Sequence, residues 1–261
     1  MIDFHAHVFS EKIAGKTLDF LSERCGTRPY TNGTPDGLSV SSDEADISLS
    51  IALPVLTKPS QFESVNAFAK QISKKNILSF GGIHPESENY KEQLFQLKNM
   101  GFQGIKLHPA YQGVNFNDIK YKRILAYASE LDLIVSVHAG FDPGYPGENY
   151  CTTKMALEVI DEVRPNKLVL AHMGGFQHWD EVEYDLAGSD IWLDTAVVFG
   201  IIEEEQFIRL SRKHGIDRIL FATDSPWSGQ KESVQCLQNM QLTDDEKMLI
   251  FEKNAKKLLT L

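Results

Sequence analysis

The chain has 261 residues, a net charge of −10 and a hydrophobic fraction of 42%. This length and composition fit one globular unit, and we expect residues 1–261 to form a single domain. The acidic balance argues against a nucleic-acid ligand, because its phosphates would be repelled. No apolar leader precedes the first predicted strand, and no apolar run is long enough to span a bilayer. We therefore expect a cytoplasmic protein without membrane contact.

The first predicted strand carries two histidines on one face. Apolar and polar residues alternate there, in the order Ile2, Asp3, Phe4, His5, Ala6, His7 and Val8. Because side chains repeat every two residues along a strand, His5 and His7 should project to the same side. Neutral imidazoles are good ligands for zinc and similar ions. Taken alone, the pair fits hydrogen-bonded histidines in a polar loop equally well.

A long segment separates this strand from the next. Residues 11–24 have a helical pattern, and the segment from Gly26 to Ser42 is rich in glycine and proline, so we predict a loop there. Long loops in compact domains are usually functional or disordered. We predict that this loop covers the strand ends as a lid.

From residue 47 onward, predicted strands and helices alternate. The strands are predicted at 47–53, 77–83, 104–108, 133–138, 167–172, 191–194 and 218–224. The helices are predicted at 61–74, 90–100, 119–130, 153–163, 180–186, 203–213, 231–239 and 243–259. With the first strand, this pattern predicts an α/β protein with eight parallel strands, a (β/α)8 TIM barrel with a C-terminal helix. An open doubly wound sheet is the alternative, and the lack of a GxGxxG motif after the first strand disfavours its dinucleotide-binding form.

Polar side chains gather at the carboxyl ends of the predicted strands, which surround one site in a barrel. They are His5, His7, His84, Lys106, His108, His138, His172 and Asp224, and they include six of the eight histidines in the chain. Each has a structural alternative. His138 could be a buried core histidine, Asp224 could cap a turn, and His84 before Pro85 is as compatible with a turn as with a site. The whole set indicates a site more strongly than any member.

Five motifs resemble those of the amidohydrolase superfamily, in the branch that includes aminocarboxymuconate semialdehyde decarboxylase. They are Asp3-Phe4-His5-Ala6-His7, Gly104-Ile105-Lys106-Leu107-His108-Pro109, Val137-His138-Ala139, Ala171-His172-Met173-Gly174-Gly175 and Thr223-Asp224-Ser225-Pro226. The resemblance implies a distorted barrel and a divalent metal, usually zinc. It also implies the metal ligands His5, His7, His138 and Asp224, and a catalytic role for His172. The branch contains hydrolases and nonoxidative decarboxylases, so the resemblance leaves the reaction open.

We therefore expect a metal-dependent hydrolase of a small carboxylated or cyclic substrate of the lactone or amide type. The metal would activate water, Asp224 would transfer its proton, and His172 would polarise the attacked carbonyl. Lys106, His108, His84 and Arg28 are the expected substrate-binding residues. One ion is expected, or two if a carboxylated Lys106 bridges them with His172 on the second.

Three other functions stay open. A nonoxidative decarboxylase with the same ligands ranks second, because the strand-end motifs contain no arginine to grip a departing carboxylate. A phosphoesterase or nuclease ranks lower, because Lys106 stands where related deoxyribonucleases carry a metal-binding glutamate. A barrel that binds a ligand without turnover is the last. The expected partner is a small-molecule substrate, and a homodimer is left open.

Overall fold

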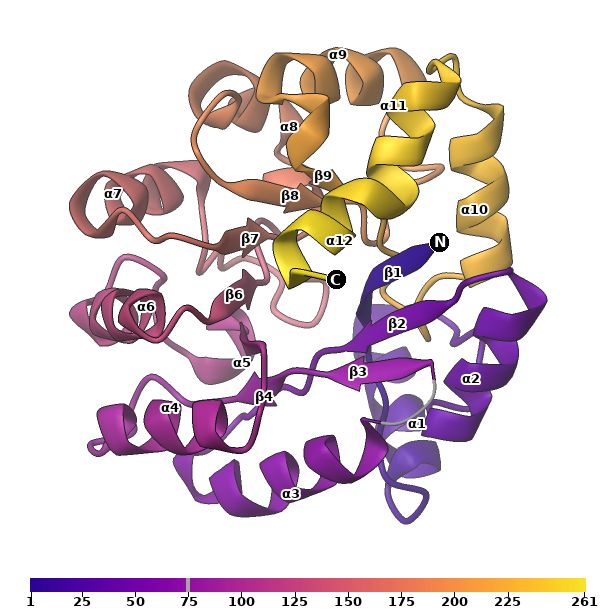
Figure 1. Ribbon diagram of the computed structural model, residues 1–261. Helices are drawn as coiled ribbons and strands as arrows, with labels where there is room; N and C mark the ends of the chain where they lie inside the picture. Colours follow the sequence, from indigo (N-terminus) through magenta and orange to yellow (C-terminus); the bar gives the residue numbers. More distant parts are fainter. Residues whose placement is uncertain (74–75) are drawn as a thin grey trace.

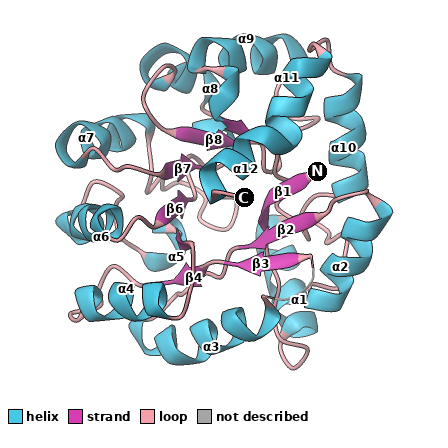
Figure 2. Cartoon of the chain, in the orientation of Figure 1, coloured by secondary structure: helices cyan, strands magenta, loops and turns pink. Residues whose placement is uncertain are grey.

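The computed structural model describes residues 1–73 and 76–261, and it has a ring of strands surrounded by helices (Figure 1, Figure 2). The strands are β1 (Ile2–Ala6), β2 (Leu49–Ala52), β3 (Ile77–Ser79), β4 (Gly81–Gly82), β5 (Gly104–Leu107), β6 (Ile134–Val137), β7 (Leu168–Leu170), β8 (Trp192–Asp194) and β9 (Ile219–Leu220). They pair in parallel, in the orders β1-β2-β3 and β4-β5-β6-β7-β8-β9.

Backbone hydrogen bonds join these two sheets into a closed barrel. β3 and β4 are halves of one extended segment interrupted at Phe80, whose N–H donates to the carbonyl of Ala52 at 2.9 Å. On the other side, the Phe4 N–H donates to the Phe221 carbonyl at 2.8 Å, and the Asp224 N–H donates to the His5 carbonyl at 2.7 Å. The predicted TIM barrel is therefore confirmed, and the open sheet is excluded.

The helices follow the predicted alternation. They are α1 (Ala14–Cys25), α2 (Pro35–Glu44), α3 (Phe62–Ile72), α4 (Tyr90–Asn99), α5 (Pro109–Gln112), α6 (Ile119–Glu130), α7 (Thr153–Val163), α8 (Trp179–Glu181), α9 (Glu204–His214), α10 (Gln230–Asn239), α11 (Asp244–Met248) and α12 (Asn254–Leu259). The end of the predicted helix 61–74 lies outside the described residues. In the part of the chain that the structure describes, no helix is long and apolar enough to cross a membrane.

Helix α2 was missed, because it begins inside the glycine- and proline-rich segment. Thr34 accepts a hydrogen bond from the Gly37 N–H at 3.0 Å, and Pro35 occupies the first helical turn. A threonine cap followed by proline is a normal helix start. The prediction of a continuous loop over Gly26–Ser42 was therefore wrong from Pro35 onward.

A bulge in β1 changes which side chains face the barrel interior. Between Asp3 and Ala6, β1 advances three residues while its partner β2 advances two, from Ser50 to Ala52. An extra residue of this kind interrupts strict alternation. Phe4 packs in the barrel interior and His5 also points inward, whereas Asp3 accepts a hydrogen bond from Gln230 of α10 at 2.8 Å. Strict alternation was therefore wrong at the bulge, because Phe4 shares the interior with His5 and Asp3 turns toward α10.

The end of the barrel at which β1 begins is filled by apolar side chains. Ala255, Leu258 and Leu259 of α12 join the same buried cluster as Ile2 and Phe4 of β1. Figure 1 shows α12 lying across this end of the ring of strands. Apolar side chains thus close this end of the barrel, and the residues of the candidate site lie at the opposite end.

Candidate active site

Two histidines at the end of β1 are held so that one nitrogen of each faces the barrel interior. His5 Nδ1 donates to the Asp194 carboxylate at 2.9 Å, and His7 Nδ1 donates to the Leu53 carbonyl at 2.7 Å. A carbonyl or carboxylate oxygen only accepts, so both Nδ1 atoms carry the proton. In the neutral rings each Nε2 then presents a lone pair, as a metal ligand must.

Asp224 completes a compact group of three donors, which we call the first donor cluster. Its Oδ1 lies 3.0 Å from His7 Nε2 and 3.5 Å from His5 Nε2, and the two Nε2 atoms are 3.1 Å apart. The edges of a tetrahedral zinc site with bonds of 2.0–2.1 Å are about 3.3 Å long. Asp224 Oδ1 is buried and accepts no hydrogen bond from any described residue. Three lone-pair atoms packed this closely fit a divalent cation.

The charges in this cluster follow from burial and contact. Burial raises the pKa of Asp224, but the attraction of His5 and His7 outweighs it and holds that pKa below the usual range. Burial, with the nearby Lys106, lowers the pKa of His5 well below the usual value. An ionised carboxylate beside a neutral imidazole is the protonation state that a bound cation requires.

Lys106 of β5 lies next to the first donor cluster. Its side chain is fully buried, and its Nζ is 3.1 Å from His5 Nε2. Burial lowers the pKa of Lys106 to about 8, although Asp194 and Asp224 oppose the shift. Lys106, a predicted substrate-binding residue, therefore contacts the predicted metal ligand His5 directly.

His172 and His138 form a hydrogen-bonded pair beside the first donor cluster. His172 Nδ1 donates to the Ala196 carbonyl at 2.9 Å, which leaves Nε2 of the neutral ring as an acceptor. His138 Nδ1 lies 3.0 Å from that Nε2 and supplies the proton. This order of donors leaves His138 Nε2 with a lone pair, and that atom is buried without a hydrogen-bond partner in the described chain.

His138 belongs to a second donor cluster, formed by His108, His138 and Asp142. Asp142 Oδ2 lies 3.5 Å from His108 Nε2 and 3.6 Å from His138 Nε2. The structure thus brings three of the four predicted metal ligands together at the first cluster and places the fourth, His138, in the second. The complete ligand set remains a prediction.

Asp194 at the end of β8 was not foreseen as a site residue. Its Oδ1 accepts the backbone N–H groups of His172 at 2.9 Å and Ala196 at 3.0 Å, while its Oδ2 accepts His5 Nδ1. One buried carboxylate therefore orients both a predicted ligand and the predicted catalytic histidine. The signal in the sequence was an acidic residue closing the predicted strand 191–194.

Two predicted substrate-binding residues lie apart from both donor clusters. His84 follows β4 and is buried, and its Nδ1 accepts the Glu86 N–H at 3.2 Å within a local turn. Arg28 is exposed in the loop between α1 and α2. The same loop reaches the end of β9, where the Tyr30 N–H donates to the Pro226 carbonyl at 2.7 Å. That contact lies on the side of the barrel where the lid is predicted.

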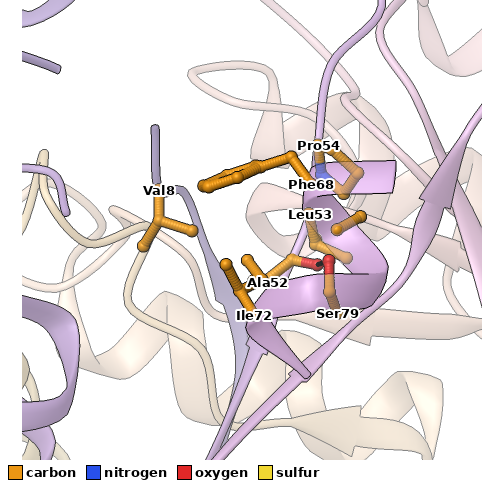
Figure 3. A pocket seen from close by; sticks show the side chains of 8 residues that line it. Val8, Ala52, Leu53, Pro54, Phe68, Ile72 and Ser79 are labelled. Carbon is orange, nitrogen blue, oxygen red and sulfur yellow. Dashed lines mark hydrogen bonds between the residues drawn. The ribbon is translucent and has the colours of Figure 1, made fainter. Parts of the chain in front are cut away.

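A small hollow beside the cluster is apolar. It lies between Val8, Leu53 and Pro54 at the ends of β1 and β2 and Phe68 and Ile72 of α3 (Figure 3). Ser79 is the one hydroxyl residue in its lining, and none of the lining side chains titrates. The chemistry is therefore expected at the two donor clusters and not in this hollow.

Comparison with known proteins places this site in a family. The model of one family, described as amidohydrolase, matches residues 2–261. The chain belongs to the amidohydrolase family. A search among curated proteins gives no match.

Several solved structures resemble this amidohydrolase over its whole length. An uncharacterised TIM-barrel protein from Bordetella bronchiseptica is 16% identical with a TM-score of 0.81, covering 100% of this chain and 98% of its own. A dihydroxybenzoic acid decarboxylase from Polaromonas sp. JS666, with bound manganese and the inhibitor 2-nitroresorcinol, is 17% identical with a TM-score of 0.77, at 100% and 96% coverage. A probable 2-pyrone-4,6-dicarboxylic acid hydrolase from Acinetobacter baumannii, with citric acid bound, is 15% identical with a TM-score of 0.71, at 100% and 99% coverage. At these identities the likeness shows a shared fold.

Proposed function

We propose that this amidohydrolase is a metal-dependent hydrolase of a small carboxylated or cyclic substrate of the lactone or amide type. The observation that carries the proposal is the first donor cluster, in which two imidazole lone pairs and an ionised carboxylate lie 3.0–3.5 Å apart. A divalent cation held by His5, His7, His138 and Asp224 would supply Lewis acidity to water and to a substrate oxygen. Zinc is the metal that we propose, and the manganese of the decarboxylase from Polaromonas is the competing choice.

The residues around this cluster have the properties that hydrolysis needs. Asp224 is ionised, and its Oδ1 accepts no hydrogen bond from the described residues, so it can take a proton from water and return it to the leaving group. We propose that His172 polarises the attacked carbonyl through Nε2, which would then carry a proton and donate to the substrate oxygen in place of its contact with His138; its ring lies 5.5 Å from the ring of His5 between centroids. Its orientation is fixed by the Ala196 carbonyl.

Substrate recognition is proposed for Lys106 and His108, with His84 and Arg28 further out. Lys106 Nζ is beside His5, so a substrate oxygen bound at the cluster would lie within its reach. His108 is near Asp142, whose carboxylate would oppose a second anion there. The substrate carboxylate is therefore expected on the Lys106 side.

A cytoplasmic location and a homodimer remain predictions.

Nonoxidative decarboxylation is the second candidate. The chain matches the dihydroxybenzoic acid decarboxylase from Polaromonas over its whole length, and both reactions can use the same donors. Nuclease activity has less support, since Lys106 is buried against His5 where a phosphoesterase would place a carboxylate.

Turnover in water labelled with ¹⁸O separates the two reactions. A panel of lactones, cyclic amides and carboxylated aromatic compounds is tested with the zinc-loaded and the manganese-loaded protein. We expect one ¹⁸O atom in the hydrolysis product. Release of carbon dioxide without ¹⁸O in the organic product would replace hydrolysis by decarboxylation.

A further inference from the structure

A buried carboxylate on β1 has no role in the reaction proposed above. Asp3 is 0% exposed, and it turns away from the barrel interior toward α10. An acidic group is costly to bury, and it is tolerated where hydrogen bonds satisfy its oxygens. The partners of Asp3 therefore show what the carboxylate does at this position.

Four hydrogen bonds end on the Asp3 carboxylate. Its Oδ1 accepts the backbone N–H of His5 at 3.2 Å and that of Thr223 at 2.9 Å. Its Oδ2 accepts the Thr223 hydroxyl at 2.6 Å and Gln230 Nε2 at 2.8 Å. Three of these four donors belong to His5 or to Thr223, the residue before Asp224. One carboxylate thus joins the chain at one predicted metal ligand to the chain beside another.

The backbone of Asp224 has a left-handed conformation. Its φ is 66°, in a region that residues other than glycine rarely adopt and that persists where surrounding contacts hold it. Thr223 Oγ1 donates to Asp3 and accepts the Ser225 N–H at 3.1 Å, so contacts on both sides of Asp224 lead back to Asp3. The Asp224 N–H itself donates to the His5 carbonyl at 2.7 Å. These bonds hold Asp224 in the conformation that directs its Oδ1 toward the imidazoles of the first donor cluster.

Gln230 of α10 extends this network to two further elements. Its Nε2 also lies 3.2 Å from Ser42 Oγ on α2 and 3.1 Å from Ser50 Oγ on β2. Gln230, Ser42 and Ser50 are each at most 1% exposed. A buried network of this kind keeps Asp3 in one orientation, because a rotation of the carboxylate would leave buried donors without an acceptor.

We propose that Asp3 is a positioning residue for the metal site, which fixes His5 and Asp224 relative to each other through the backbone of both segments. Its carboxylate contacts main-chain and supporting groups and not the donor atoms of the first cluster. This task differs from that of Asp194, which holds the ring of His5. The proposal rests on the metal site of the proposed function, and it applies to hydrolysis and to decarboxylation alike.

The affinity of metal-stripped protein for zinc, measured by competition with a zinc-sensing dye, tests this role. Asp3→Asn keeps one oxygen but turns the other position into a donor, so the donors that faced it lose their acceptor. Thr223→Val removes the hydroxyl between Asp3 and Ser225, and Thr223→Ser restores it. We expect zinc binding to be about 10-fold weaker or more in Asp3→Asn and Thr223→Val. Thr223→Ser should bind zinc nearly as tightly as the wild type.

A control variant separates positioning from a general loss of stability. Asn254 is 1% exposed, and its Nδ2 donates to the carbonyls of Ile216 and Ile219 at 2.8 Å, where β9 begins. Asn254→Ala should therefore be less stable in urea but keep the zinc affinity of the wild type. An equal loss of zinc affinity in Asn254→Ala and Asp3→Asn would make the effect one of stability and overturn the positioning role.

Hydrogen exchange in the metal-free protein provides a measurement that needs no zinc. The amides of Asp224 and Ser225, followed by NMR, should exchange faster in Asp3→Asn and Thr223→Val than in the wild type and Thr223→Ser. Unchanged exchange, or a zinc affinity in both variants equal to that of the wild type, would overturn the role of Asp3 and leave the metal site standing. A wild type that binds no zinc would instead overturn the proposed metal site and, with it, this role. If Asp3→Asn does not fold, the two Thr223 variants decide the question.

Discussion

Asp194 connects the predicted ligand His5 to the predicted catalytic residue His172. Replacing Asp194 by asparagine keeps an oxygen for the two backbone N–H groups but places an NH₂ group opposite His5 Nδ1–H. His5 must then rotate or change tautomer. Changes to such supporting carboxylates typically cost about 10–100-fold in metal affinity. We expect this loss for Asp194→Asn in a competition assay with a zinc-sensing dye. Asp161→Asn, an exposed position on α7, is the control, and equal affinities in both variants would refute the role of Asp194.

His172 is predicted to act on substrate more than on metal. In His172→Asn the donors of the first cluster are unchanged, since none of them bonds to the His172 ring. The zinc bound by that cluster should therefore remain, while turnover on the active substrate falls about 100-fold or more, as expected when a group that stabilises charge is removed. Elemental analysis and initial rates on the same samples check both parts. Loss of zinc from the first cluster would instead make His172 a ligand.

His214, at the end of α9, should make stability depend on pH. Its Nδ1 accepts the Gly188 N–H and its Nε2 donates to the Ile191 carbonyl, a neutral pattern in a buried position. Burial, followed by the repulsion of Arg218, lowers its pKa from 6.5 to about 4. The unfolded chain thus binds more protons between these values, and the free energy of unfolding falls as pH drops from 6.5 to 4, by at most roughly 3 kcal/mol for this group.

His214→Gln tests this pH dependence. Glutamine keeps a donor for the Ile191 carbonyl but cannot be protonated. Urea unfolding at pH 7 and at pH 4 should show a smaller loss of stability in the variant than in the wild type. The other buried histidines keep part of the slope in both proteins. Equal losses in the two proteins would contradict the assignment.

Among the elements, α2 was the one predicted least well, and β1 shows best what a local pattern cannot predict. Glycine and proline density hid α2, although Thr34 and Pro35 are ordinary helix-start residues. Helix boundaries elsewhere were predicted well because apolar periodicity and stop residues are local signals, as in Ile119–Glu130 and Thr153–Val163. The outward direction of the Asp3 side chain could not be predicted. It depends on the β1 bulge, which is defined by the register of β1 against β2, a contact between residues distant in sequence.

The same distinction applies to the site. Strand ends could be read from alternation, so the histidines of the first donor cluster and its Asp224 were anticipated. The partition of His138 into another cluster depends on Asp142, which lies in a loop whose path no local pattern specifies. Side-chain hydrogen bonds such as that between His5 and Asp194 also join residues far apart in sequence.

The start of α2 offers a test at this scale. Thr34→Ala removes the acceptor of the Gly37 N–H and should cost about 1 kcal/mol of unfolding free energy. Amide hydrogen exchange should rise first in α2, because a lost cap frays its own helix. Thr31→Ala is the control, because Thr31 lies three residues before Thr34 and does not cap α2. Protection in α2 that stays equal in the two variants would show that the cap is not needed.

At the scale of the whole molecule, we expect α12 to stabilise the barrel by packing against the end at which β1 begins. Leu258 is 4% exposed and packs in the interior cluster, whereas Leu261 is 64% exposed. Leu258→Ala should therefore cost about 2–5 kcal/mol in urea unfolding, and Leu261→Ala should stay within about 0.5 kcal/mol of the wild type. Similar values for the two variants would mean that α12 contributes little to the core.

The hydrogen-bonded contact between β1 and residues 221–225, which we call the seam, joins two segments that the ribosome makes at different times. Asp3 and the Thr223 N–H that donates to it are 220 residues apart, and the seam carries both His5 and Asp224. A ribosome adds roughly 5–20 residues per second, so His5 and His7 wait on the order of 10–40 s for their carboxylate partner. The donors of the second cluster are encoded much closer together, within residues 108–142. A nascent chain therefore carries that cluster's three donors before Asp224 completes the first donor cluster.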